Sequence, residues 1–183
     1  MKLDNNKDLT NGARRTLKSL KTAFITLLTK KSFDELKIQD LSKESMIPRS
    51  TFYNYFDDKY DLLTWFLSDT SEMEYDDLES FDDIFKLINT FFDVIDSYKN
   101  LIDKILVKNP KTSFFYHSFI DNIEAAAVRR ISPLQSNIKS EMPIDLIARW
   151  YARSVILIFE YVYVDHNKCT RKEMFDYIRK FIS

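Results

Sequence analysis

A single glycine, Gly12, is present among 183 residues, together with only four prolines. β-Sandwiches, barrels and phosphate-binding loops need several backbone positions with positive φ, which glycine adopts most readily. Apolar residues instead recur at intervals of three and four along most of the chain, the spacing that gives a helix one buried face. Hydrophobic residues make up 45% and charged residues 30% of the chain, as in a globular protein. The sequence therefore predicts an all-α fold.

The apolar periodicity predicts nine helices. The first runs from Arg14 to about Lys31, and two short helices follow, from Ile38 to Ser45 and from Arg49 to Phe56. Pro48 separates the short helices, because proline disfavours helical backbone in the residue before it and fits the first position of a new helix. Six further helices are predicted over residues 62–75, 81–95, 101–106, 115–133, 143–165 and 174–182.

Charge is distributed unevenly along the chain. Residues 1–56 hold 11 basic and 6 acidic side chains, a net charge of +5, whereas the rest of the chain carries −6. A basic N-terminal segment on an acidic body indicates a polyanionic partner for that segment. The alternative is an uneven charge on a solvated surface with no partner.

Two short helices joined by a tight turn, preceded by a longer helix in the basic segment, fit a helix-turn-helix DNA reader. In the second short helix, Phe52 and Phe56 are four residues apart and are expected to pack inward. Arginine reads guanine, asparagine reads adenine, and a tyrosine ring contacts a thymine methyl group or a phosphate. Side chains of these types occupy the opposite face of the helix, at Arg49, Ser50, Tyr53 and Asn54.

Residues 33–42 and 48–63, including the pattern T-F-Y-x-x-F-x-x-K-x-x-L-L from Thr51 to Leu63, resemble the N-terminal domain of the TetR/AcrR family of transcriptional regulators. The resemblance is strong over residues 14–67. Beyond them only the number of helices, the chain length and a penultimate helix rich in Trp and Tyr are similar. By resemblance, the base-reading residues are Gln39, Arg49, Ser50, Tyr53 and Asn54, and the phosphate-binding residues are Lys37, Thr51, Tyr55 and Lys59.

This sequence departs from the family pattern at four positions. Met46 stands where the family usually has glycine in the turn, and Pro48 stands where it often has a capping serine. Lys37 replaces a threonine that commonly caps the second helix, and Tyr55 replaces a frequent histidine. These departures predict a tighter or shifted turn, and a second helix that lacks its side-chain cap at a cost of about 1 kcal/mol.

Residues 1–12 lack apolar periodicity and are predicted to form a flexible arm. The resemblance implies a helix-turn-helix domain at 13–60 and a helical regulatory and dimerisation domain at 61–183. The last part would dimerise through its final two helices and hold a ligand pocket. The predicted dimer interface comprises Ile147, Tyr151, Ile158, Tyr161, Met174, Ile178 and Phe181. Aromatic residues that could line the pocket, or that simply belong to the core, are Phe85, Phe92, Phe115, Tyr116, Phe119 and Trp150.

A second subunit is also suggested by residues 155–164, which are apolar on nearly every side of a helix apart from Glu160. The segment is too short for a bilayer span, which needs about 20 residues. A helix that is apolar on more than one face must be covered from more than one side. A partner chain is a plausible part of that cover.

The sequence predicts no enzymatic activity, metal or cofactor. His117 and His166 lack the E-x-x-H and H-x-x-x-H spacings of zinc sites, and Cys169 has no nearby C-x-x-C partner. The glycine-rich phosphate-binding patterns are impossible with one glycine. The lone cysteine and the lack of an N-terminal signal segment predict a cytoplasmic protein that is not associated with a membrane.

The predicted function is a homodimeric repressor that binds a palindromic double-stranded DNA operator and is released by a small apolar or aromatic effector. The alternative is a coactivator of the same fold that acts through a protein partner and does not read DNA by itself. The departures at Met46, Pro48 and Lys37 favour this alternative. The segment from Trp150 to Ile182 also faintly resembles family members related to the dihydroxyacetone-kinase operon activators, some of which bind a protein.

Overall fold

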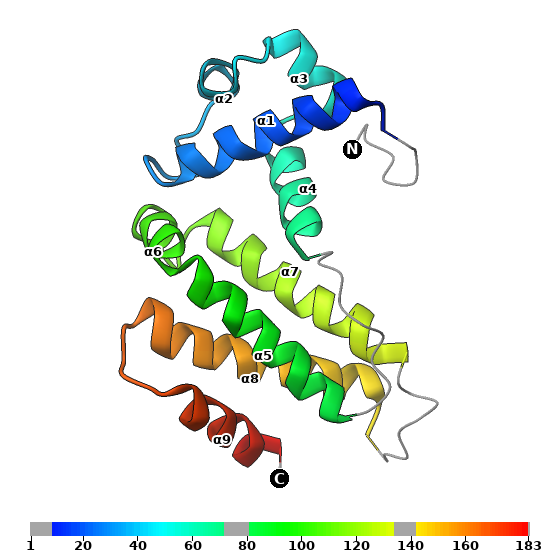
Figure 1. The fold of residues 1–183 in the computed structure, drawn as a ribbon, viewed down its shortest axis with the longest axis vertical. Coiled ribbons are helices and arrows are strands. Elements are labelled where there is room, and N and C mark those ends of the chain that lie inside the picture. The colour runs from blue at the N-terminus through cyan, green and yellow to red at the C-terminus, as the bar shows by residue number, and fades with distance from the viewer. Residues whose placement is uncertain (1–8, 72–80, 134–141, 183) are drawn as a thin grey trace. The chain divides into compact units, whose positions relative to one another are not determined.

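The computed structural model describes residues 9–71, 81–133 and 142–182 (Figure 1). These ranges contain nine α-helices and no strand, so the predicted all-α fold class is confirmed. No helix in them is long and apolar enough to cross a membrane. The helices are α1 (Asn11–Leu28), α2 (Ile38–Ser45), α3 (Arg49–Tyr55), α4 (Lys59–Ser71), α5 (Phe81–Ser97), α6 (Lys99–Lys108), α7 (Phe114–Ile131), α8 (Ile144–Phe159) and α9 (Arg171–Ile182).

The start of α1 falls within the predicted N-terminal arm. Thr10 takes an extended conformation, and its hydroxyl accepts a hydrogen bond from the backbone N–H of Ala13 at 3.2 Å. Threonine is a favourable N-cap because its side chain satisfies a backbone donor that the first helical turn leaves free. The helix therefore begins at Asn11, and residues 1–8 of the arm lie outside the described residues.

The chain divides into two compact units. Unit 1 contains α1 to α4 together with the segment from Lys104 to Ser118, and unit 2 contains α5, the first half of α6, and the chain from Phe119 onward. The boundaries fall inside α6 and α7, so the loop between these helices belongs to unit 1. The boundaries of these units differ from the predicted domain boundary at residue 60, which rests on the family resemblance and stays a prediction.

The core of unit 1 is built from large aromatic side chains. Phe24 of α1 contacts Phe66 of α4 edge to face, with ring centroids 5.2 Å apart. Phe52 and Phe56 are buried, and the Phe56 ring lies against Trp65 at 5.4 Å. Edge and tilted ring contacts of this kind stabilise a core beyond the area that they bury. They fix α3 on α4 and leave the other side of α3 exposed.

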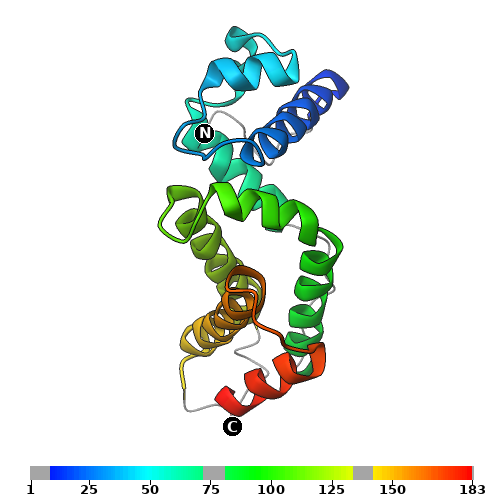
Figure 2. The same ribbon diagram turned by 90° about the vertical axis from the view of Figure 1, so that its left-hand side faces the viewer.

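Unit 2 has an aromatic stack at its centre. The rings of Phe92, Tyr163 and Phe159 are nearly parallel, with successive centroids 6.1 and 5.6 Å apart. The Tyr163 hydroxyl donates a hydrogen bond to Asp96 at 2.6 Å, and burial together with this carboxylate raises the pKa of Tyr163. Arg171 at the start of α9 pairs with Asp96 and with Asp93, which holds α9 beside α5 (Figure 2).

The helix predicted to end near residue 165 changes its winding before it ends. After α8 the chain continues as a π-helical segment, η2, from Glu160 to Val164. Tyr163 of the aromatic stack lies in this segment. His166, two residues beyond η2, has a positive φ of 54°. The wider winding of η2 therefore lies where the chain turns toward α9.

Candidate nucleic-acid interface

Helix α3 has one buried and one exposed side. Phe52 and Phe56 lie in the core of unit 1, with 1% and 0% of their surface exposed. The side chains on the outer side are all exposed, and Tyr53 has 42% of its surface exposed. These side chains are Arg49, Ser50, Tyr53 and Asn54. The structure therefore places the four predicted base-reading residues of α3 on one accessible surface. Gln39 of α2, the fifth, is also exposed.

The turn between α2 and α3 forms without glycine. Met46 adopts a left-handed conformation, with φ 58° and ψ 22°, and 88% of its surface is exposed. For a residue with a Cβ this conformation costs about 1–2 kcal/mol. The Ser42 hydroxyl donates to the carbonyl of Ile47 at 2.7 Å, and the Ser45 hydroxyl accepts from the backbone N–H of Ile47 at 3.2 Å. These two hydrogen bonds hold the turn, and both short helices keep nearly their predicted bounds.

The N-terminus of α2 is held by an acidic residue. Lys37, at the N-cap, makes no side-chain cap, as the sequence predicts. Asp40 instead pairs with the Lys31 ammonium and accepts a hydrogen bond from the backbone N–H of Lys37, both at 3.0 Å. These two interactions hold the pKa of Asp40 below its usual value. An acidic residue three positions after the N-cap is the sequence signal for this arrangement.

Lys59 has a structural role that sequence reasoning missed. Its ammonium donates hydrogen bonds to the carbonyls of Phe33, Asp34 and Leu36 at 2.9, 2.8 and 3.1 Å. It also lies 4.9 Å from the centroid of the Phe33 ring. An ammonium has three N–H donors, so this set uses all of them. The predicted contact of Lys59 with a phosphate would require the ammonium to leave these carbonyls.

The other predicted phosphate-binding residues differ in their exposure. Lys37 is exposed, and Thr51 and Tyr55 are half-buried on α3. All three belong to unit 1, as do the predicted base-reading residues. The structure thus brings the predicted DNA-binding residues together on one compact unit.

Asn109, which no sequence pattern singles out, anchors the loop between α1 and α2. It is fully buried, and its side-chain carbonyl accepts a hydrogen bond from the backbone N–H of Phe33 at 2.7 Å. Its amide group donates to the carbonyls of Ile105 and Leu28 at 3.0 and 3.4 Å. A residue that follows α6 therefore fixes the backbone that leads into the helix-turn-helix.

The predicted pocket residues do not gather in one unit. Phe115 and Tyr116 are buried in unit 1, whereas the other four belong to unit 2. Within unit 2, Phe92 takes part in the aromatic stack and Phe119 lies against Phe159 at 5.8 Å. Trp150 lies on the exposed side of α8. Each of the six predicted pocket residues therefore either packs against other side chains or, in the case of Trp150, is exposed.

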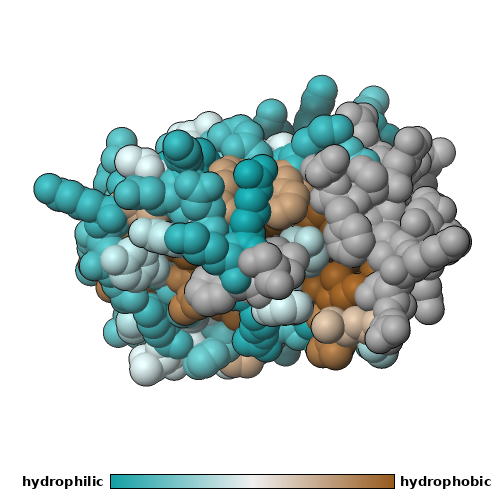
Figure 3. Space-filling model, turned by 90° about the horizontal axis from the view of Figure 1, so that it is seen from below, coloured by the Kyte–Doolittle hydropathy of each residue, from teal (hydrophilic) through white to brown (hydrophobic). Residues whose placement is uncertain are grey.

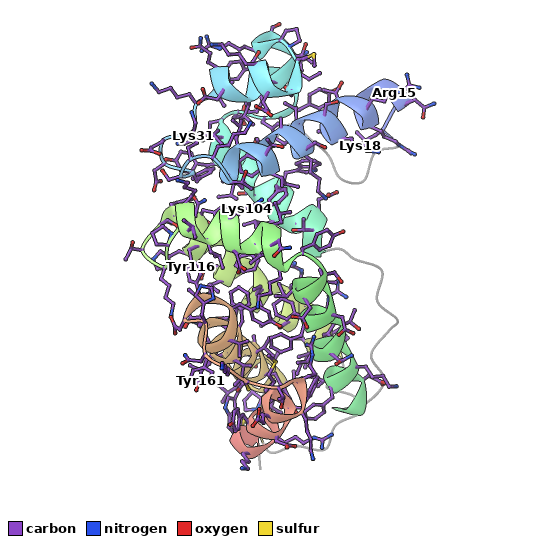
Figure 4. The ribbon with its side chains drawn as sticks, turned by 60° about the vertical axis from the view of Figure 1, so that its left-hand side comes forward. Arg15, Lys18, Lys31, Lys104, Tyr116 and Tyr161 are labelled. Carbon is purple, nitrogen blue, oxygen red and sulfur yellow. The ribbon has the colours of Figure 1, made fainter. Side chains whose placement is uncertain are left out.

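The predicted dimer interface is also divided. Tyr161 is exposed (Figure 4), and the side chain of Phe181 lies outside the described residues. The remaining five are buried within a single chain, namely Ile147, Tyr151, Ile158, Met174 and Ile178. A different set of apolar side chains lies on the outside of α8 and η2, at Leu146, Trp150, Leu157 and Tyr161. We call these four residues the outer stripe. In Figure 3, hydrophobic residues also reach the surface between hydrophilic ones.

The all-helical fold and the exposed polar side of α3 are those expected of a DNA-binding regulator of the helix-turn-helix type. Residues 22–64 match the family model described as bacterial regulatory proteins, tetR family. The chain is also 28% identical over 144 residues to the HTH-type dhaKLM operon transcriptional activator DhaS of Lactococcus lactis subsp. lactis (strain IL1403). That similarity covers 64% of this chain and 77% of the relative. Both findings support a TetR family transcriptional regulator and confirm the resemblance seen in the sequence.

Proposed function

We propose that this regulator is a homodimer that binds a palindromic operator, with the α3 helices of its two chains in successive major grooves. The observation that carries the proposal is the exposed row of Arg49, Tyr53 and Asn54, held outward by the buried rings of Phe52 and Phe56. Arginine and asparagine side chains distinguish base pairs from the major groove. Two copies related by a two-fold axis match the symmetry of a palindrome.

The outer stripe supports dimerisation. Its residues are spaced by four, seven and four positions, which places them on one side of the helical segment. Arg153 lies within this stretch, but Glu124 pairs with it at 2.5 Å and with Arg149 at 2.6 Å. Arg153 is therefore ion-paired inside the same chain, and one carboxylate shared by two arginines leaves this cluster a net charge of +1. A two-fold axis would set two such stripes against each other.

The regulator could act either as a repressor or as an activator of transcription. The sequence favours a repressor that a small apolar or aromatic effector releases from DNA. The relative from Lactococcus lactis is named as a transcriptional activator, which favours activation, either from the operator or through a protein partner. A reporter gene placed behind the bound DNA sequence distinguishes the two, because deletion of the regulator raises expression in one case and lowers it in the other.

Selection from a library of random duplexes with the purified full chain tests the proposal. We expect enrichment of palindromic sequences whose half-sites are centred about 10–10.5 base pairs apart, or a multiple of that spacing. The complex with each selected duplex should contain an even number of chains. If no sequence is enriched and a second protein co-purifies with the chain, the coactivator without its own DNA recognition takes the place of this proposal.

Leu157→Glu is expected to convert the dimer to a monomer, because a polar carboxylate on the outer stripe would have to lose its water when the interface forms. Leu157 is 51% exposed in the single chain, so the fold itself should tolerate the change. Sedimentation equilibrium measures the mass of the particle. Val107→Glu, at an exposed apolar residue of unit 1, is the matched control and should stay dimeric. A dimeric Leu157→Glu variant would place the interface elsewhere.

A further inference from the structure

The basic residues of α1 and of the turn that follows it fall into two groups. Those in the later part are neutralised by acidic residues of neighbouring helices, in the pairs Lys21–Asp69 at 2.6 Å, Lys30–Glu44 at 3.1 Å and Lys31–Asp40 at 3.0 Å. Those in the first two turns are exposed, and none forms an ion pair within the described part of the chain. This second group comprises Arg14, Arg15 and Lys18, which we call the α1 cation cluster.

The cluster occupies one side of the helix. Arg14 and Arg15 precede Lys18 by four and three residues, so the three side chains are neighbours on the helix surface. Leu17 and Leu20 point the other way, into the core of unit 1. Figure 4 shows Arg15 and Lys18 extending from the N-terminal end of α1. The cluster therefore presents three positive charges on one accessible surface.

This arrangement is electrostatically unfavourable in the isolated chain. Like charges three or four residues apart on a helix cost about 0.2–0.5 kcal/mol per pair. Positive charge near a helix N-terminus also opposes the helix dipole, and no acidic residue stands in the first turn of α1 to offset it. Both costs fall when an anionic partner lies against the cluster.

We propose that the α1 cation cluster is a second DNA contact surface, one that binds backbone phosphates beside the groove that α3 enters. The inference rests on the proposed function, because it takes DNA as the partner of unit 1. Duplex DNA carries about one negative charge per 1.7 Å of its axis, so phosphates extend along the groove on both sides of the base edges that α3 reads. The cluster and α3 belong to the same compact unit (Figure 1).

Binding of phosphates has a measurable signature. Each phosphate that the protein neutralises, with release of its counterions, adds about 0.9 to the slope of log affinity against log salt concentration, whatever the DNA sequence. If the cluster binds three phosphates, each chain that binds the duplex would therefore add up to about 2.7 to this slope. Base-reading residues act differently, because their removal reduces the preference for one sequence over another.

The test compares two triple variants of the full chain. The cluster variant lacks the α1 cation cluster and carries Arg14→Gln, Arg15→Gln and Lys18→Gln. The control variant loses the same number of positive charges from the ion-paired lysines and carries Lys21→Gln, Lys30→Gln and Lys31→Gln. Dissociation constants are measured across a salt series for a duplex selected by the wild-type protein and for a scrambled duplex of equal length. Thermal unfolding of both variants verifies the fold, and the cluster variant should be at least as stable as the wild type.

We expect the cluster variant to bind both duplexes more weakly by the same factor, with a salt slope reduced by about 0.9 for each phosphate that the variant no longer binds. The control variant should change the slope by less than the value for one phosphate. Equal slopes for the cluster variant and the wild type would overturn the inference, as would an equal reduction in the control. Weaker binding limited to the selected duplex would also overturn it.

The same measurements separate this inference from the proposed function. If the wild type prefers its selected duplex but the cluster variant keeps the full salt slope, the operator-binding function stands and the phosphate surface is refuted. If the wild type binds all duplexes equally and the cluster variant has a reduced slope, the phosphate surface stands and specific operator reading fails. A wild-type protein that binds no duplex refutes both.

Discussion

Arg49→Ala combined with Tyr53→Ala is expected to abolish the preference for the operator while the protein remains folded and dimeric. Both side chains are exposed on α3, and substitutions at such positions change stability by less than about 0.5 kcal/mol. A good contact between a side chain and a base edge discriminates against the wrong base by about 1–3 kcal/mol. Truncating both side chains in each of two chains therefore removes most of the specificity, which gel-shift titration against selected and scrambled duplexes measures.

Lys43→Ala provides the control, since Lys43 is exposed on α2 but is not among the predicted base-reading residues. This variant should keep the wild-type ratio of affinities for the two duplexes. If the Arg49 and Tyr53 double variant keeps the wild-type ratio of affinities, the outer side of α3 does not read the operator. Tyr53→Phe then separates the ring from the hydroxyl, because packing against a thymine methyl group survives removal of the hydroxyl and a hydrogen bond does not.

Asn109→Ala is expected to lower the free energy of unfolding by at least about 1–3 kcal/mol, the cost of leaving a buried donor such as the Phe33 N–H without an acceptor. The variant also removes the side-chain donor from the carbonyl of Leu28 and one of two donors from the carbonyl of Ile105, and it opens a small void. In a chain of this size each kcal/mol lowers the melting temperature by about 2–4 °C. Calorimetry or circular dichroism during heating measures the change.

The matched control is Asn100→Ala, at an exposed asparagine of α6. Its unfolding should stay close to that of the wild type, because water can hydrogen-bond to the groups that the substitution leaves. Equal melting temperatures for the two variants would show that Asn109 does not hold the loop between α1 and α2. A large destabilisation in Asn109→Ala accompanied by weaker DNA binding would show that this loop also supports the placement of α2.

Local patterns were sufficient to predict much of the fold. The bounds of α2 agree with the structure at both ends, and α3 begins at the predicted residue, because Pro48 interrupts a regular apolar pattern. The two sides of α3 also follow from spacing alone, since residues four apart share a side of a helix. Asp40 could have been found in the same way, as an acidic residue three positions after the N-cap.

Features that depend on distant parts of the chain could not be predicted. Asn109 hydrogen-bonds to residues 76 and 81 positions earlier, and nothing local to it indicates this. Helix α8 is apolar on several sides, so its sequence does not reveal which side the same chain covers. The predicted interface therefore included residues such as Tyr151 and Ile158 that unit 2 buries itself. For Lys59 the sequence gives the charge but not the carbonyls that surround it.

The three carbonyls around Lys59 also bear on how this part of the protein would respond to ionic strength. Mobile ions weaken attraction between separated, exposed charges, but they have little effect on a half-buried ammonium in direct contact with backbone oxygens. We therefore expect concentrated salt to dissociate the protein from a polyanion without loosening the segment from Phe33 to Leu36. Dissociation and unfolding would then be separate events, and a chain released by salt would keep the fold that it needs to bind again after dilution.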